Sequence, residues 1–311
     1  MNVLLRIIYK TILYTSPVWL FFFYLEYRLS SLENSYSFKI KNFNKVKDSC
    51  KVLVLGNSEM LKGVNPDFLP QPAFNMAHVS QNFIVDEQIM QKYLPQLPQL
   101  KIVILGLSYL SFGDDLESGE EAWRVAFYKK YYHLNLKSGL DLKDYSYTLR
   151  YTPYESLKMC MKNFKADLIN GMQTNGWMKT DSFDAKDLTD ESAKQKAEMH
   201  TRNLKEKNVE MNVRALRNIL MMLKEKHIKV LIIAPPVMRN YYQNLNTYWL
   251  AKNDSILNSI TGEFNPVVIN FAEANDSLYT TFQNGFNDEN HLNKNGADRL
   301  GILLREIFNK N

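Results

Sequence analysis

Five short, continuously apolar runs constrain the fold of this 311-residue chain more than any other feature. A strand that alternates apolar and polar residues has one face in water, whereas an unbroken apolar run is typical of a strand covered on both faces. The runs therefore predict buried strands of a parallel sheet. They lie at residues 51–56, 72–77 (the weakest of them), 101–107, 229–236 and 266–271.

Helical patterns alternate with these runs. Residues 208–226 carry one helix stripe, formed by Val209, Val213, Leu216, Leu220 and Leu223. The last segment repeats this spacing with Leu300, Leu303, Leu304, Ile307 and Phe308. Alternating strands and helices predict the α/β class, with a flavodoxin-like, doubly wound parallel sheet of about five strands. Ligands of such sheets bind beyond the carboxyl ends of the strands.

One stretch, about 114–207, interrupts the alternation and contains no convincing strand. Helical patches near 154–169 and 189–206 predict a helical insertion between the third and fourth strands. Its start is acidic, and we interpret this run as a solvated loop because no converging metal ligands can be shown. The acidic residues are Asp114, Asp115, Glu117, Glu120 and Glu121.

The N-terminus predicts a membrane anchor. Residues 11–25 carry no charge, and a membrane-spanning helix needs about 20 apolar residues. Arg6 and Lys10 precede this run and can snorkel to the interface, while Trp19 and Tyr24 resemble interfacial aromatic residues. A cleaved signal peptide would need a small-x-small site, and a buried helix of a soluble domain is the other alternative. We favour a retained, single-pass signal anchor.

This interpretation divides the chain into an anchor at 1–28, a polar linker at 29–50 and one domain at 51–311. Arg6 and Lys10 would stay in the cytoplasm, which places the domain outside the cytoplasmic membrane. The positive-inside signal is modest, because Arg28, Lys39 and Lys41 follow on the other side of the apolar run.

Composition excludes some classes of protein. Lys and Arg number 38 and Asp and Glu 33, which gives a net charge of 38 − 33 = +5. The basic residues are spread among acidic ones, without a basic tract or zinc-finger spacing, so we expect no nucleic-acid partner. Cys50 and Cys160 are not spaced as metal ligands, and a disulfide between them can be neither inferred nor excluded. We predict no metal and no cofactor.

The first predicted strand ends at Gly56, and Ser58 lies two residues after it. A hydroxyl there lies at the top of the sheet and near a helix N-terminus, whose N–H groups favour developing negative charge. Taken alone, Ser and Asn at this point are explained better by helix capping, because both are favoured N-cap residues.

Asp288 and His291 lie three residues apart before the final helix. That spacing lets a carboxylate orient an imidazole that acts as a general base. A nucleophile after the first strand and this pair before the last helix would meet at one edge of the sheet. His78 lies near the second strand and is more often a surface histidine than a second base.

The segments GNSE at 56–59 and DENHLN at 288–293, together with Gly296, resemble the first and last blocks of the SGNH/GDSL hydrolases. The resemblance covers about 51–113 and 228–311. It implies the SGNH hydrolase fold, with Ser58 as nucleophile, His291 as base and Asp288 as its orienting acid. The chain is most similar to two branches. They are the D-alanyl transfer proteins of teichoic-acid synthesis and the proteins that work beside membrane-bound O-acyltransferases.

The middle blocks depart from the family pattern. Asn75, Ala77 and Ser80 stand where the second block has Asn-x-Gly-x-x-Gly, and Ser108 replaces the Asn of the third block. The resemblance then implies oxyanion donors at Ser58, Ser80 and Ser108. Asn75 and Gln81 become candidate substrate-binding residues. Loss of one oxyanion donor costs about 10²–10³ in rate in a well-studied protease, so the departures weigh against efficient free hydrolysis.

These expectations lead to three hypotheses. The first is an anchored serine esterase or O-acyltransferase that modifies an exported polysaccharide or a teichoic-acid-like polymer through an acyl-serine. The second is a non-catalytic binding or assembly protein that partners a membrane-bound O-acyltransferase. The third is a soluble enzyme whose first helix is buried.

Aromatic residues near the insertion and the fourth strand offer a way to stack on sugar rings, but core packing explains them more often. They are Trp123, Tyr128, Tyr131, Tyr132, Tyr241, Tyr242, Tyr248 and Trp249.

Overall fold

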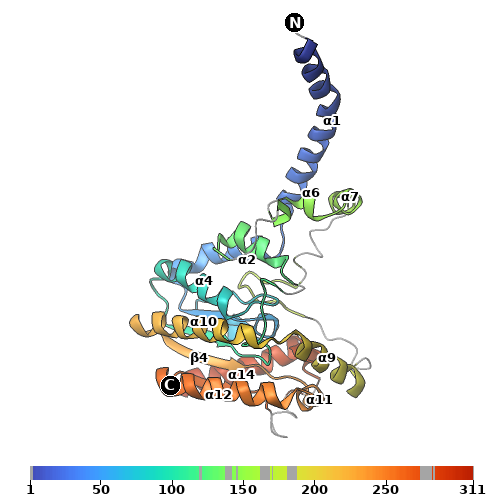
Figure 1. The fold of residues 1–311 in the computed structure, drawn as a ribbon. Coiled ribbons are helices and arrows are strands. Elements are labelled where there is room, and N and C mark those ends of the chain that lie inside the picture. The colour runs from blue at the N-terminus through green and yellow to red at the C-terminus, as the bar shows by residue number, and fades with distance from the viewer. Residues whose placement is uncertain are drawn as a thin grey trace.

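The five predicted runs form one parallel sheet with the strand order β2-β1-β3-β4-β5 (Figure 1). The computed structural model describes residues 3–310, apart from 119–120, 137–141, 145, 162–168, 170, 181–187, 274–281 and 283. The strands are β1 Val52–Leu55, β2 Ala73–Asn75, β3 Ile102–Gly106, β4 Lys229–Ala234 and β5 Val267–Asn270.

The described residues also form helices and helical turns. They are α1 Val3–Ser31, α2 Ser35–Val46, η1 Lys47–Ser49, α3 Ser58–Gly63, η2 Pro66–Phe68, α4 Phe83–Tyr93, η3 Leu94–Gln96, α5 Arg124–Phe127, the π-helical turn η4 Tyr128–Tyr132, η5 Leu142–Asp144, α6 Tyr147–Arg150, α7 Pro153–Met161, α9 Asp190–Asn203, α10 Glu206–Glu225, α11 Arg239–Gln243, α12 Thr247–Phe264 and α14 Lys294–Lys310.

Successive side chains of each strand enter different cores, as the continuous apolar runs predict. Leu53 and Val103 pack in a cluster that also holds apolar side chains of α2, α4 and α10. Val54 and Ile104 pack in a second cluster with α3 and α14. Both faces of the sheet are therefore covered, and the predicted α/β, doubly wound architecture is confirmed.

Residues 29–50 differ from the predicted polar linker. Asn34 caps α2 by accepting hydrogen bonds from the N–H groups of Tyr36 and Ser37. Tyr36 and Phe43 then lie one above the other on the helix and are buried in the core. The polar composition hid this, because two well-spaced aromatic residues and a capping box suffice to dock a short helix.

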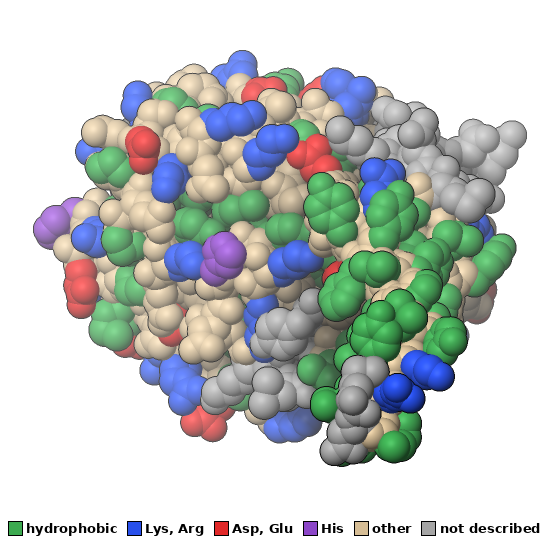
Figure 2. All heavy atoms as spheres, turned by 90° about the horizontal axis from the view of Figure 1, so that it is seen from above, with side chains coloured by type: hydrophobic (Ala, Val, Ile, Leu, Met, Phe, Trp, Pro, Cys, Tyr) green, Lys and Arg blue, Asp and Glu red, His purple; other side chains and the backbone are tan. Residues whose placement is uncertain are grey.

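The helix α1 extends away from the sheet and exposes apolar side chains along most of its length (Figures 1 and 2). No helix within the described residues is both long enough and apolar enough to cross a membrane. The transmembrane helix predicted within residues 1–28 is therefore not found. Charged residues at Arg6, Lys10 and Glu26 interrupt the apolar sequence of α1.

Glu26 fastens the C-terminal part of α1 to the body of the protein. Its carboxylate accepts hydrogen bonds from the N–H groups of Tyr147 and Thr148 at the start of α6, at 3.1 and 3.0 Å. The hydroxyls of Ser146 and Thr148 also donate to it. A carboxylate at a helix N-terminus is favoured by the exposed N–H groups there, so α1 and α6 hold one another.

The predicted insertion contains helices, as expected. The helix α9 matches the patch predicted at 189–206, and α7 covers the first part of the patch predicted at 154–169. The remainder of that patch lies mostly outside the described residues. Residues 171–180 form a turn closed by an antiparallel bridge between Met172 and Met178. The N–H of Met178 also donates to the carbonyl of Leu61 in α3 at 3.0 Å.

A small antiparallel hairpin, β6 Phe286–Asp288 and β7 His291–Leu292, precedes α14 and was not predicted. Behind it, Gly296 lies against the backbone of Gly285. A Cβ atom on Gly296 would come within 2.0 Å of the Gly285 carbonyl oxygen. This position therefore requires glycine if the hairpin is to lie against α14.

We expect Gly296→Ala to lower the free energy of unfolding by about 1–3 kcal/mol, because the backbone must shift to admit the methyl group. Gly262→Ala is the matched control, since a Cβ atom there, near the C-terminal end of α12, meets nothing within 4 Å. It should instead raise stability by about 0.5–1 kcal/mol, the helix preference of Ala over Gly. Urea unfolding followed by circular dichroism measures both changes. Equal effects of the two substitutions would contradict this account of the hairpin.

Candidate active site

Ser58 begins α3 immediately beyond the carboxyl end of β1. Gly56 makes the turn with φ of +127°, and a Cβ atom on it would lie 3.1 Å from the Gly106 backbone of β3. Asn57 then caps α3, because its side-chain oxygen accepts a hydrogen bond from the N–H of Glu59 at 3.0 Å. This arrangement lifts the Ser58 hydroxyl above the edge of the sheet.

The structure brings the three predicted catalytic residues together. The Nε2 atom of His291 lies 2.7 Å from the Ser58 Oγ. Its Nδ1 atom lies 2.7 and 2.8 Å from the two carboxylate oxygens of Asp288. The Asp288 carboxylate also accepts the N–H group of His291 itself, at 3.0 Å. These contacts orient the imidazole so that its second nitrogen faces the serine, which is the geometry of a general base.

Burial lowers the pKa of His291 below its ordinary value, and the hydrogen bond and charge of Asp288 oppose this effect. The imidazole is therefore neutral at pH 7 and free to take a proton. Burial alone would raise the pKa of Asp288, but the hydrogen bond to His291 and the charges of His291 and Lys62 lower it well below its usual range. Asp288 is consequently a fixed negative charge beside the base.

Two side chains of α3 complete the electrostatics of this site. The Nζ atom of Lys62 lies 3.8 Å from an Asp288 carboxylate oxygen. Glu59 is buried and accepts a hydrogen bond from the Nδ2 atom of Asn290 at 3.0 Å. Burial raises the pKa of Glu59 to about 8, so at neutral pH this carboxyl is mostly protonated. Of these two carboxyl groups, Asp288 therefore carries its negative charge at neutral pH, and Glu59 mostly does not.

Sequence reasoning missed the roles of Glu59, Lys62 and Asn290. Glu59 was noted only as part of the GNSE motif. The available signal was the helical spacing that puts Lys62 one turn after Ser58, on the same face of α3. Asn290 could be found only through the hairpin, which was not predicted.

The predicted oxyanion residues border the site in different ways. Ser108 follows β3, and its hydroxyl oxygen accepts hydrogen bonds from the Asn57 Nδ2 at 2.9 Å and from the N–H of Leu110 at 3.2 Å. The same hydroxyl also lies 3.3 Å from the Ser111 hydroxyl. Ser80 has a left-handed backbone with φ of 56° and lines the same cavity as Ser58. Their roles as oxyanion donors remain predictions.

The two predicted substrate-binding residues have their amides engaged elsewhere. Asn75 is fully buried, and its Nδ2 donates to the carbonyls of Met60 and Val64 at 2.9 and 2.8 Å. It therefore holds the end of α3 and does not line the cavity, contrary to the expectation of a substrate contact. Gln81 does line the cavity, but its side chain bridges Asp86 and Tyr128, at 2.6 and 2.8 Å.

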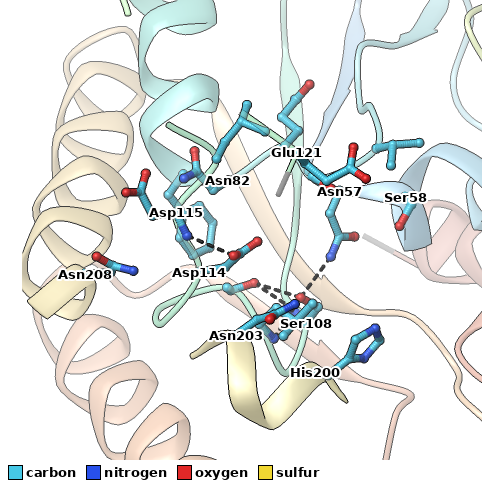
Figure 3. A pocket seen from close by; sticks show the side chains of 18 of the residues that line it. Asn57, Ser58, Asn82, Ser108, Asp114, Asp115, Glu121, His200, Asn203 and Asn208 are labelled. Carbon is cyan, nitrogen blue, oxygen red and sulfur yellow. Dashed lines mark hydrogen bonds between the residues drawn. The ribbon is translucent and has the colours of Figure 1, made fainter. Parts of the chain in front are cut away.

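A cavity of about 700 Å³ extends from Ser58 and His291 across the carboxyl edge of the sheet (Figure 3). One wall comes from the turn at residues 79–83. Another comes from α9 and the start of α10, which belong to the predicted insertion. The acidic run interpreted as a solvated loop contributes Asp114, Asp115 and Glu121 to the lining of this cavity (Figure 3).

The remaining sequence candidates have structural roles. None of the eight aromatic side chains considered for sugar stacking lines this cavity. His78 is buried, stacks on Tyr36 at 3.8 Å and contacts the hydroxyl of Ser35 at 3.1 Å. Cys50 and Cys160 are free thiols. Among the described residues, no group of three or more His, Cys, Asp or Glu side chains is placed to hold a metal ion.

Comparison with known proteins gives low similarity. The sequence matches no protein-family model, and no curated protein matches it. A GDSL-like lipase from Bacteroides thetaiotaomicron superposes with a TM-score of 0.40 and 10% identity, over 88% of this chain and 98% of that chain. A lipase/acylhydrolase from Enterococcus faecalis gives a TM-score of 0.37 and 11% identity, over 84% and 96% of the two chains.

Glu59→Gln tests the protonated carboxyl behind Ser58. A carboxyl with a raised pKa in the folded state stabilises the protein below its unfolded pKa of 4.5, and this contribution is lost as pH rises through about 8. The amide keeps the hydrogen bond to Asn290 and has no proton to lose. We therefore expect the unfolding free energy of Glu59→Gln to rise relative to that of the wild type between pH 5 and pH 8. Urea unfolding at each pH measures this difference. A difference that does not change with pH would refute a raised pKa.

Lys62→Gln tests the charge beside Asp288. The Lys62 charge lowers the pKa of His291, so its removal should raise the pH at which His291 loses its proton. The measurement is the rate at which a fluorophosphonate labels Ser58 from pH 4 to 8. We expect the midpoint of this profile to move upward in Lys62→Gln and to stay unchanged in Lys226→Gln, a control at the distant, exposed end of α10. A downward shift would show that the sign of this coupling is wrong.

Proposed function

We propose that this chain is a serine acyl-transfer enzyme of the SGNH/GDSL type. The observation that supports this most directly is the continuous contact from Ser58 to His291 to Asp288, with both hydrogen bonds at 2.7 Å. A serine hydroxyl is a weak nucleophile on its own and needs an adjacent, oriented base. This site supplies the base in its neutral form.

In the proposed reaction, Ser58 Oγ attacks the carbonyl carbon of an ester or thioester while its proton passes to His291 Nε2. The bond to the leaving oxygen or sulfur breaks, and His291 returns the proton to that leaving group. This leaves an acyl group on Ser58. A water molecule or an acceptor hydroxyl then loses a proton to His291, attacks the acyl-serine and releases Ser58 with its proton restored.

We further propose that the acceptor is a hydroxyl of a cell-surface polysaccharide or a teichoic-acid-like polymer. Support comes from the shape of the site. A cavity of about 700 Å³ is larger than a short acyl group needs, and its walls carry many polar side chains. This is the branch of the superfamily that the sequence resembles, with the D-alanyl transfer and O-acyltransferase-associated proteins.

Attachment to the outer face of the cytoplasmic membrane through residues 1–28 is part of the proposal. It is supported by the exposed apolar side chains of α1, among them Trp19 and Phe23, at 61% and 69% exposure. In this arrangement a membrane-bound O-acyltransferase is the expected donor of the acyl group. Fractionation of washed membranes tests the attachment.

A second function, binding without catalysis, is favoured by one observation. Ser108 stands where the family has an asparagine, and its hydroxyl already accepts two hydrogen bonds. A weakened oxyanion site would suit a protein that holds a polymer for a membrane-bound O-acyltransferase partner.

The deciding experiment is labelling of the full-length protein, in detergent, with a fluorophosphonate probe. We expect Ser58 to be labelled at neutral pH, and we expect both Ser58→Ala and His291→Ala to abolish labelling. His227→Ala is a control at an exposed histidine far from the site. A folded wild-type protein that is not labelled would favour the binding function.

Hydrolysis and transfer are then separated by product analysis. The enzyme is given a p-nitrophenyl ester with and without a soluble polyol acceptor, and the products are identified by mass spectrometry. Acyl-polyol formed only when Ser58 is present supports transfer. Free acid as the sole product at every acceptor concentration excludes it.

A further inference from the structure

The helix α9 turns one face toward the proposed active site. Lys196, Met199, His200 and Asn203 all line the cavity. Their spacing of three, four and seven residues from Lys196 is that of a single helix face. The insertion therefore supplies a complete wall of the cavity, facing the residues that carry the chemistry.

Two contacts hold this wall in place. The Nδ1 atom of His200 lies 2.7 Å from the Tyr241 hydroxyl of α11. In the next position, the Thr201 hydroxyl lies 2.8 Å from the Tyr109 hydroxyl. Burial lowers the pKa of His200 to about 4, so this imidazole is neutral at physiological pH. The α9 wall is thus fixed to the body of the domain by a neutral histidine.

Lys196 brings a positive charge that the described residues do not neutralise. None of their carboxylates forms an ion pair with Lys196, and the same holds for Arg202 and Lys207, which also line the cavity. The charge of Lys196 also lowers the pKa values of Lys62, His200 and His291. Like charges gathered in a cleft raise the local concentration of anions.

The acidic side chains of the opposite wall are engaged with their own neighbours. Glu121 forms an ion pair with Arg124. The Asp115 carboxylate accepts hydrogen bonds from the N–H of Glu117 at 2.9 Å and from the Ser118 hydroxyl at 2.5 Å. Asp115 also lies at the end of the cavity away from Ser58 and His200 (Figure 3). Asp114 accepts the N–H of Asp115 at 2.9 Å. Among the described residues, none of these carboxylates forms an ion pair with Lys196.

We propose that the α9 wall binds the acceptor polymer and that Lys196 contacts an anionic group on it, a carboxylate or a phosphate. This inference rests on the proposed acyl transfer and adds the wall and the residue that select an anionic acceptor. A polymer with one anionic group in each repeat would then present successive hydroxyls to Ser58 while its charge is held by α9.

Direct binding tests the inference without requiring turnover. Isothermal titration of the full-length protein uses three probes: an oligogalacturonate, a short poly(glycerol phosphate) and a neutral dextran oligosaccharide. We expect an anionic probe to bind more tightly than the neutral one, with an affinity that falls as salt rises. Lys196→Gln should weaken that binding about tenfold, the usual cost of losing one charge-assisted hydrogen bond. Lys196→Arg should restore most of it.

Lys194→Gln is the matched control, because it removes the same charge from the exposed side of the same helix. Preference for the oligogalacturonate or for the poly(glycerol phosphate), lost in Lys196→Gln alone, supports the proposal and identifies the anionic group. Equal binding of the neutral probe overturns it, as does an equal loss in both glutamine variants. Labelling of Ser58 is measured on the same preparations, so a failure of the proposed chemistry is seen separately from a failure of acceptor binding.

Discussion

Cover on both faces of the parallel sheet is the constraint on which the rest of this structure depends. Because all five strands run the same way, each connection must return across a face, and every strand ends at the same edge. Ser58 leaves the sheet at that edge after β1, and Ser108 does so after β3. The hairpin that carries Asp288 and His291 lies at the same edge before α14. Ser58 and His291, which are more than 200 positions apart in sequence, therefore lie in hydrogen-bonding distance because of the strand topology.

The features that the sequence could predict are those set by short-range pattern. Unbroken apolar runs located all five strands, and helix stripes located α10 and α14, because burial acts on every residue of such a segment. The meeting of Ser58 with His291 was predicted from the topology together with the resemblance of two short motifs to the SGNH/GDSL hydrolases. The strand and helix predictions needed only the period of the pattern.

The features that could not be predicted depend on single contacts between distant segments. The docking of α2 depends on Tyr36 and Phe43, which lie in a polar stretch. No run of apolar residues in the sequence predicts this docking. Asn75 occupies the position that the family pattern assigns to the oxyanion block, yet its amide holds the carbonyls at the end of α3. Whether such an amide faces a ligand or a helix end is decided by the neighbouring backbone. That neighbour is known only once the chain is folded.

The short helix α3 gathers the electrostatic control of the site. Ser58, Glu59 and Lys62 come from little more than one turn of it. Glu59 is held in its neutral form by burial, while Lys62 stabilises the charge on Asp288. Substitution of Lys62 in this helix changes the proton affinity of His291 as well. The nucleophile Ser58 and the lysine that lowers the pKa of its base therefore belong to the same short helix.

The attachment of α1 through Glu26 makes this helix a spacer. At 1.5 Å per residue, its 29 residues extend about 44 Å. Because the carboxylate of Glu26 fixes the C-terminal part of α1 against α6, the N-terminal end of the helix is held at a set distance from the body of the protein (Figure 1). Lengthening or shortening this helix by one turn would move its N-terminal end by about 5 Å and rotate it little, without altering a residue of the site.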